Sequence, residues 1–163
     1  MLQTINRILY ASDLGQGSRP AFRYAVNEAI KHNAEIIFLH AVEPISELTE
    51  DIIEDYLPEK LSKKHSEQIM QSRKQRITER IESFVQSELE AGVSLPKPAI
   101  IKVSIGQPHK IILDKAKTMA ADMIVMGDRE SNSISRIFLG STAQKVIHQS
   151  QVPVLIVPLR KEK

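Results

Sequence analysis

The element that decides the fold is the apolar run Ile36-Ile37-Phe38-Leu39-His40-Ala41-Val42, which stops just before Pro44. A short run of this kind suits a strand, and its apolar residues occupy successive positions instead of alternating with polar ones. A strand with two apolar faces is typical of a parallel sheet that helices cover on both sides. The run therefore predicts a buried strand in an α/β domain.

Toward the N-terminus, a shorter apolar run, Arg7–Ala11, ends in the turn sequence Ser12-Asp13-Leu14-Gly15. Ser18 and Pro20 then form the N-cap and first-turn proline pattern that begins many helices. The residues that follow at helical spacing are apolar, as one face of a buried helix requires: Phe22, Ala25, Val26, Ala29 and Ile30. The chain up to Val42 therefore predicts a strand, a helix and a second strand.

Charge divides the next part of the chain into two segments. Residues 43–59 hold seven acidic residues and no basic one, and residues 60–80 hold seven Lys and Arg with two acidic residues. We predict a short helix at Leu48–Tyr56 and, after Pro58, a long helix that ends near Gly92. The long helix has an apolar stripe of Met70, Ile77, Ile81, Phe84, Val85 and Leu89. The charged segments are a solvated loop and helix face, or alternatively a surface for a partner.

The rest of the chain repeats the alternation of strand and helix. We predict strands at Ile101–Ile105, at Met123–Met126 up to Gly127, and at Val152–Pro158, with helices that begin after Gly106 and at Ser141. Strict alternation favours one parallel sheet with right-handed crossovers and a layer of helices on each face. We therefore predict a single three-layer α/β domain over residues 1–163, with a five-stranded sheet.

Composition excludes several classes of function. The chain has 163 residues and no Cys, which excludes disulfides, thiolate zinc sites, iron–sulfur clusters and a cysteine nucleophile. No run of about 18 apolar residues predicts a membrane span. A net charge of +2 and seven scattered aromatic residues give no reason to expect nucleic-acid binding. With no signal-peptide pattern at the start, we expect a cytoplasmic protein.

Ligands of parallel α/β sheets bind beyond the carboxyl ends of the strands, so we expect the functional residues to lie there. Gly15, Gly17 and Pro20 miss the dinucleotide fingerprint at its third glycine, and no Walker-type phosphate loop occurs. A phosphate-receiving domain is excluded because the third strand ends in Ser104-Ile105-Gly106, without an acidic residue. The five His residues form no metal-binding motif.

The strongest functional signal is Gly127-Asp128-Arg129-Glu130, followed after nine residues by Gly140-Ser141. A glycine that closes a strand lets a ligand approach the backbone. A glycine just before a helix leaves N–H groups at the positive end of the helix dipole, which is a ready anion site. Alternatively, Ser141 and Gln144 form a capping box that serves only the start of the helix.

At these residues the chain resembles the universal stress protein family. The resemblance extends over nearly the whole chain and includes Arg7–Asp13, Leu39–Val42, Gly106–Pro108, Asp122–Gly127, Gly140–Ala143 and Val152–Val157. It implies the sheet order 3-2-1-4-5. The ATP-binding members carry G-x2-G-x9-G-[ST], so the resemblance implies an adenine-nucleotide site for ATP, with Mg²⁺, or AMP, and at most a slow ATPase activity.

The nucleotide-binding residues that the resemblance implies lie at the ends of the first, second and fourth strands and at the start of the last helix. They are Ser12, Asp13, Val42, Met126, Gly127, Gly140, Ser141 and Thr142. We add Arg129, a cation that can meet a phosphate. We also predict a homodimer through the fifth strand, Val152–Val157, because an apolar terminal strand would otherwise leave an exposed edge.

One position departs from the family's motif. Its second glycine is Glu130 here, and a carboxylate about 5 Å from a phosphate charge costs roughly 3 kcal/mol at an effective dielectric constant of about 20. Two functions therefore stay open. The chain is either a nucleotide-binding stress-response regulator or a dimeric interaction module of the same family that binds no nucleotide.

Overall fold

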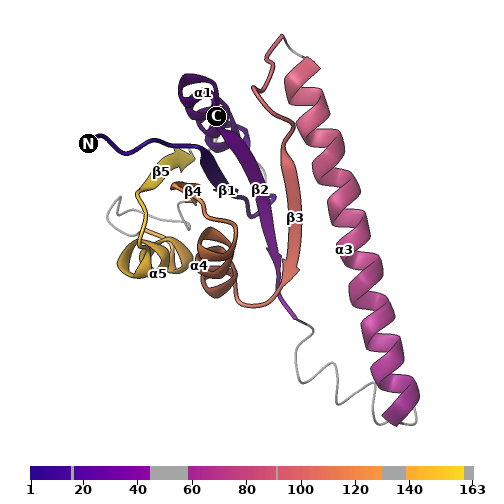
Figure 1. Ribbon diagram of the computed structural model, residues 1–163. Helices are drawn as coiled ribbons and strands as arrows, with labels where there is room; N and C mark the ends of the chain where they lie inside the picture. The colour runs from indigo at the N-terminus through magenta and orange to yellow at the C-terminus, as the bar shows by residue number, and fades with distance from the viewer. Residues whose placement is uncertain (16, 45–58, 91, 130–138, 160–163) are drawn as a thin grey trace.

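The computed structural model describes residues 1–15, 17–44, 59–90, 92–129 and 139–159 (Figure 1). The predicted helix at Leu48–Tyr56 and residue Glu130 lie outside this part of the chain. The elements in chain order are β1 (Arg7–Ala11), α1 (Arg19–His32), β2 (Glu35–Val42), α3 (Glu59–Glu90), β3 (Ile100–Ile105), α4 (Pro108–Thr118), β4 (Met123–Arg129), α5 (Ser141–Gln149) and β5 (Val154–Leu159).

The strands form one five-stranded sheet in the order β3-β2-β1-β4-β5, with every neighbouring pair parallel. This confirms the predicted topology. Strand β1 lies at the centre, where Ile8 is paired with Ile36 of β2 on one side and with Met123 of β4 on the other. The chain order changes direction at β1, and this switch point is where parallel sheets bind ligands.

Helices cover both faces of the sheet, so the predicted three-layer sandwich is also confirmed (Figure 1). On one face Tyr10 and Phe38 pack with residues of α1 and α3, such as Phe22 and Ile81. On the other face, the core residues from the strands and from α4 and α5 are Leu9, Leu39, Ile112, Ile124 and Val146. Alternate residues of β1 and β2 thus enter different cores, which explains why both strands are apolar throughout.

Helix α3 is much longer than the strands that it accompanies. Its 32 residues correspond to about 48 Å at 1.5 Å per residue. The C-terminal half carries Ile81 and Val85, which are buried against the sheet, as the predicted stripe requires. Figure 1 shows that the N-terminal half extends past the carboxyl ends of β2 and β3. The helix therefore brings polar side chains alongside that edge of the sheet.

Candidate functional site

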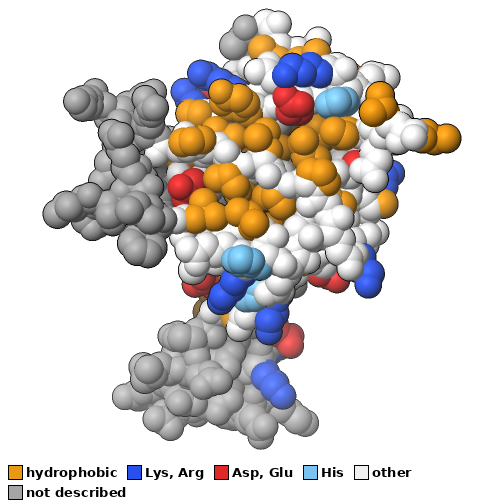
Figure 2. Space-filling view, turned by 90° about the vertical axis from the view of Figure 1, so that its left-hand side faces the viewer, with side chains coloured by type: hydrophobic (Ala, Val, Ile, Leu, Met, Phe, Trp, Pro, Cys, Tyr) orange, Lys and Arg blue, Asp and Glu red, His pale blue; other side chains and the backbone are white. Residues whose placement is uncertain are grey.

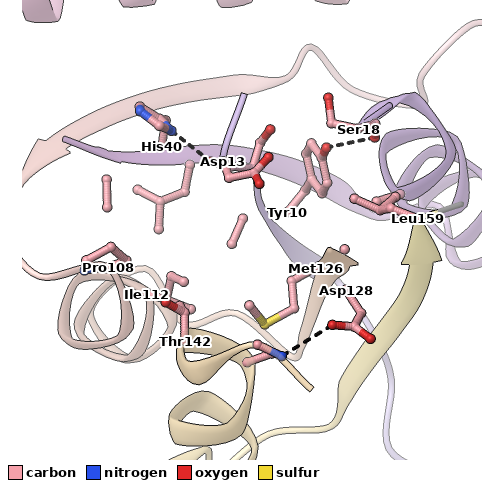
Figure 3. Close-up of a pocket in the computed structure, with 18 of the residues that line it drawn as sticks. Tyr10, Asp13, Ser18, His40, Pro108, Ile112, Met126, Asp128, Thr142 and Leu159 are labelled. Atoms are coloured by element: carbon pink, nitrogen blue, oxygen red, sulfur yellow. Dashed lines mark hydrogen bonds between the residues drawn. The ribbon is translucent and has the colours of Figure 1, made fainter. Parts of the chain in front are cut away.

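A cavity of about 550 Å³ lies at the carboxyl ends of β1, β2 and β4 (Figure 3). Its volume falls within the usual range for small-molecule sites, roughly 300–1,000 Å³. The start of α5 and the first turn of α4 complete the wall, with Thr142 and Pro108 among the lining residues. The cavity thus occupies the switch point of the sheet.

Nearly all of the residues predicted to bind a nucleotide line this one cavity. They are Ser12, Asp13, Val42, Met126, Gly127, Gly140, Ser141 and Thr142. Arg129 is the last residue of β4, and its side chain lies outside the described part of the structure. The fold therefore brings together segments that are more than 100 residues apart in sequence, such as Asp13 and Gly140.

The turn after β1 is fixed by its own side chains. The buried Ser12 hydroxyl accepts a hydrogen bond from the Leu14 N–H at 3.1 Å, and Asp13 Oδ1 accepts one from the Gly15 N–H at 2.9 Å. Such local bonds are typical of turns that begin with Ser or Asp. They hold Ser12 and Asp13 in place at the edge of the cavity without help from a ligand.

His40 of β2 joins the second strand to this turn. Its Nδ1 lies 2.8 Å from the Ser12 carbonyl oxygen. Because a carbonyl oxygen can only accept, Nδ1 donates this hydrogen bond. Two residues further on, Val42 also lines the cavity; its side chain is buried in the α1/α3 core, and its carbonyl accepts a hydrogen bond from the Gly106 N–H at 2.9 Å.

Gly127 makes a close contact that the sequence did not predict. Strand β4 does not end at Gly127 but continues to Arg129, paired with β5. A Cβ atom at Gly127 would lie 2.5 Å from Leu159 Cδ1 and 2.9 Å from Leu159 Cγ. The group that approaches the Gly127 backbone closely is thus the chain's own β5 side chain. The prediction that the fourth strand ends at Gly127 was therefore wrong, although Gly127 still lines the cavity.

We expect Gly127→Ala to lower the free energy of unfolding by about 1–3 kcal/mol, the usual cost of overpacking. Leu159→Ala should remove most of that cost by opening the space. Urea unfolding of both single variants and the double variant measures this as a coupling free energy. A Gly127→Ala cost that is the same with and without the Leu159 side chain would contradict the assignment.

The start of α5 forms the opposite wall of the cavity. Gly140 is the N-cap, and its carbonyl accepts the first helical hydrogen bond from the Gln144 N–H at 3.0 Å. Gly140 has no side chain with which to cap the helix, and Ser141 is the first helical residue and not the residue before it. The predicted capping box is therefore absent. The first-turn N–H groups have no acceptors within the helix and lie beside the cavity.

Three charged residues of the cavity wall, Glu43, Arg73 and Asp128, were not predicted as site residues. Arg73 comes from α3, more than 30 residues after the end of β2, and no motif marks it. Asp128 is a spacer position in the glycine motif, yet its Oδ1 accepts a hydrogen bond from the Gly140 N–H at 3.3 Å (Figure 3). Asp128 could have been noticed in the sequence because it is an acidic residue within the motif proposed to bind phosphate.

The described side chains of the cavity are more acidic than basic. Asp13, Glu43 and Asp128 contribute carboxylates, and Arg73 contributes the one guanidinium among the described lining residues. On α4, partial desolvation and then the ammonium groups of Lys145 and Lys110 lower the pKa of His109 from 6.5. That imidazole is therefore neutral at pH 7 and adds no positive charge.

The described residues contain no group of three or more His, Cys, Asp or Glu that could hold a metal ion. None of their helices is both long enough and apolar enough to cross a membrane.

Known proteins resemble this chain in sequence and in fold. The model of the universal stress protein family matches residues 4–158. A universal stress protein from Thermus aquaticus, named for its place in the QAH/OAS sulfhydrylase 3' region, is 31% identical over 92% of this chain and 96% of its own length. Universal stress protein MJ0577 from Methanocaldococcus jannaschii is 27% identical over 93% of both chains.

The solved structures of this fold agree. Hypothetical protein MJ0577 has a TM-score of 0.70 at 22% identity, covering 99% of this chain and 100% of its own. A universal stress protein solved in complex with cAMP has a TM-score of 0.59 at 20% identity, covering 97% of this chain and 100% of its own. A universal stress protein from Archaeoglobus fulgidus solved in complex with dAMP has a TM-score of 0.50 at 17% identity, covering 94% of this chain and 97% of its own. By the family match and the Thermus relative, this chain belongs to the universal stress protein family.

Proposed function

We propose that the chain is a stress-response regulator that binds an adenine nucleotide, ATP or AMP, in the cavity at the carboxyl ends of β1 and β4. The observation that carries the proposal is that residues from four separate segments, selected from sequence alone, line a single cavity of nucleotide size. The cAMP and dAMP complexes of two proteins with this fold support it.

Each part of the cavity offers suitable chemistry for a part of the ligand. The Val42 backbone and the Asp13 carboxylate are hydrogen-bonding groups for adenine or ribose, and Met126 supplies an apolar contact for the sugar. The N–H groups of Gly140, Ser141 and Thr142 would face the phosphates at the positive end of α5. ATP would bring Mg²⁺ with it, and AMP would need no metal.

Calorimetric titration of the purified chain with ATP and with AMP, each with and without Mg²⁺, tests the proposal. We expect saturable heat with at least one of the two nucleotides. The absence of heat with both at millimolar concentration would overturn it. That result would favour the alternative, an interaction module that binds no nucleotide. The alternative agrees with the hydrogen bond from the Gly140 N–H to the Asp128 carboxylate, which suits a helix start that binds no phosphate.

We further propose that the chain forms a homodimer through Val152–Val157. Strand β5 lies at the edge of the sheet, and Val154, Leu155 and Ile156 are only partly buried. Figure 2, which faces the β5 side of the molecule, shows hydrophobic side chains gathered over a broad area. A second copy would cover both the apolar side chains and the unpaired strand edge.

Light scattering at micromolar concentration is expected to give twice the mass of one chain. As a control, Val93→Ser removes an exposed apolar side chain that lies far from β5 in sequence, and it should leave the mass unchanged. A monomer mass for the parent chain would contradict the dimer.

A further inference from the structure

The carboxylate of Asp128 accepts a hydrogen bond from an N–H group that a phosphate is proposed to contact. It lies on β4, lines the cavity, and accepts a hydrogen bond from the N–H of Gly140, the N-cap of α5 (Figure 3). A helix N-terminus favours a negative group, because its N–H groups and dipole give it a partial positive charge. Here the chain supplies that negative group itself.

The other charges of the cavity increase the effect. Asp13 and Glu43 are also acidic, and Arg73 is the only Lys or Arg among the described lining side chains. Like charges about 5 Å apart repel by roughly 3 kcal/mol at an effective dielectric constant of about 20, and a triphosphate carries several such charges. The repulsion therefore rises with every phosphate that a ligand adds.

The uncharged part of the cavity, in contrast, suits a nucleoside. Tyr10, Leu39, Ile112 and Met126 give it apolar surface for a base and a sugar. The second carboxylate oxygen of Asp128 has no hydrogen-bond partner among the described residues, so it can accept a bond from a ribose hydroxyl. A nucleoside can thus bind without displacing Asp128 from Gly140.

We infer that Asp128 determines the specificity of this site and selects adenine ligands of low negative charge, the nucleoside or a monophosphate, over the triphosphate. The inference rests on the proposed function, because it concerns the same cavity and the same base. The nucleoside leaves the hydrogen bond between Asp128 and Gly140 intact, and a monophosphate brings fewer negative charges toward Asp128 than a triphosphate does. A triphosphate has to compete with the carboxylate for the start of α5.

The experiment is a calorimetric titration of adenosine, AMP and ATP into the parent chain, Asp128→Asn and Asp128→Ala. Asp128→Asn removes the charge but keeps an oxygen that can accept from the Gly140 N–H, and thermal unfolding checks that each variant is folded. Asp114→Asn is the matched control, since Asp114 lies on α4, does not line the cavity and has a 57% exposed side chain.

In the parent we expect adenosine and AMP to bind at least about tenfold more tightly than ATP, with or without Mg²⁺, which is about 1.4 kcal/mol. Asp128→Asn and Asp128→Ala should raise the ATP affinity about tenfold and leave that of adenosine within about twofold, and Asp114→Asn should change neither. A parent that binds ATP as tightly as adenosine, or an Asp128→Asn variant that loses affinity for Mg·ATP, would overturn the inference and leave nucleotide binding standing. Failure of all three ligands with every variant would instead overturn the proposed function itself.

Discussion

Replacing Phe38 with Ala is expected to lower the free energy of unfolding by about 3–5 kcal/mol, a large share of the roughly 5–15 kcal/mol that stabilises a domain. Phe38 is 1% exposed and lies where two layers of the fold meet. Its ring centroid is 4.8 Å from that of Tyr10 on β1, 5.7 Å from Phe22 on α1 and 6.2 Å from Phe84 on α3. The substitution therefore leaves a void that no single neighbour can fill.

Urea unfolding, followed by circular dichroism, measures the loss. Tyr24→Ala is the matched control, because Tyr24 is an aromatic residue of α1 with 52% exposure, and it should cost less than about 1 kcal/mol. A Phe38→Ala loss as small as the control's would mean that the α1/α3 core does not pack as described. Because Tyr10 also lines the cavity, the Phe38→Ala variant should bind nucleotide more weakly as well.

The sheet was predictable because its strands leave few alternatives. Ile36–Val42 and Arg7–Ala11 have no polar face, and only a sheet covered on both sides can bury such strands. The long helix was predictable in part, since Ile81 and Val85 continue a regular apolar stripe. Both features follow from the local spacing of apolar residues, which can be read from a single sequence.

The role of Gly127 was not predictable from the sequence, because it depends on a tertiary contact. Gly127 is paired with Val157 of β5, and that register brings the side chain of Leu159 over the glycine. Nothing near Gly127 in sequence indicates a neighbour 32 residues away. The sequence therefore did not predict that Gly127 accommodates a leucine side chain.

The start of α5 shows how a shift of one residue changes an interpretation. Ser141 and Gln144 have the spacing of a capping box only if Ser141 is the N-cap. The helix begins at Ser141, so Gly140 takes the N-cap position and the two side chains lose that geometry. The exact ends of a helix are difficult to predict from a sequence, and the interpretation of this wall of the cavity depends on where α5 begins.

Gly140→Asp is expected to separate stability from nucleotide binding. Gly140 has φ −56° and ψ 149°, which any residue can adopt, and an added Cβ would have no neighbour within 4 Å among the described residues. Asp is also a favoured N-cap. The free energy of unfolding of the variant should therefore lie within about 1 kcal/mol of that of the parent, because repulsion between the new carboxylate and Asp128 opposes the stabilisation by the cap.

The same side chain would place a second carboxylate at the edge of the cavity where phosphates are proposed to bind. At about 5 Å from a phosphate charge it should cost roughly 3 kcal/mol, which weakens AMP and ATP binding about 100-fold. Adenosine carries no phosphate and should lose little affinity, and Gly140→Ala, the uncharged control, should bind all three ligands almost as the parent does. If Gly140→Asp weakened adenosine as much as AMP, the variant would be acting by bulk and not by charge, and the phosphates would have to be placed elsewhere in the cavity.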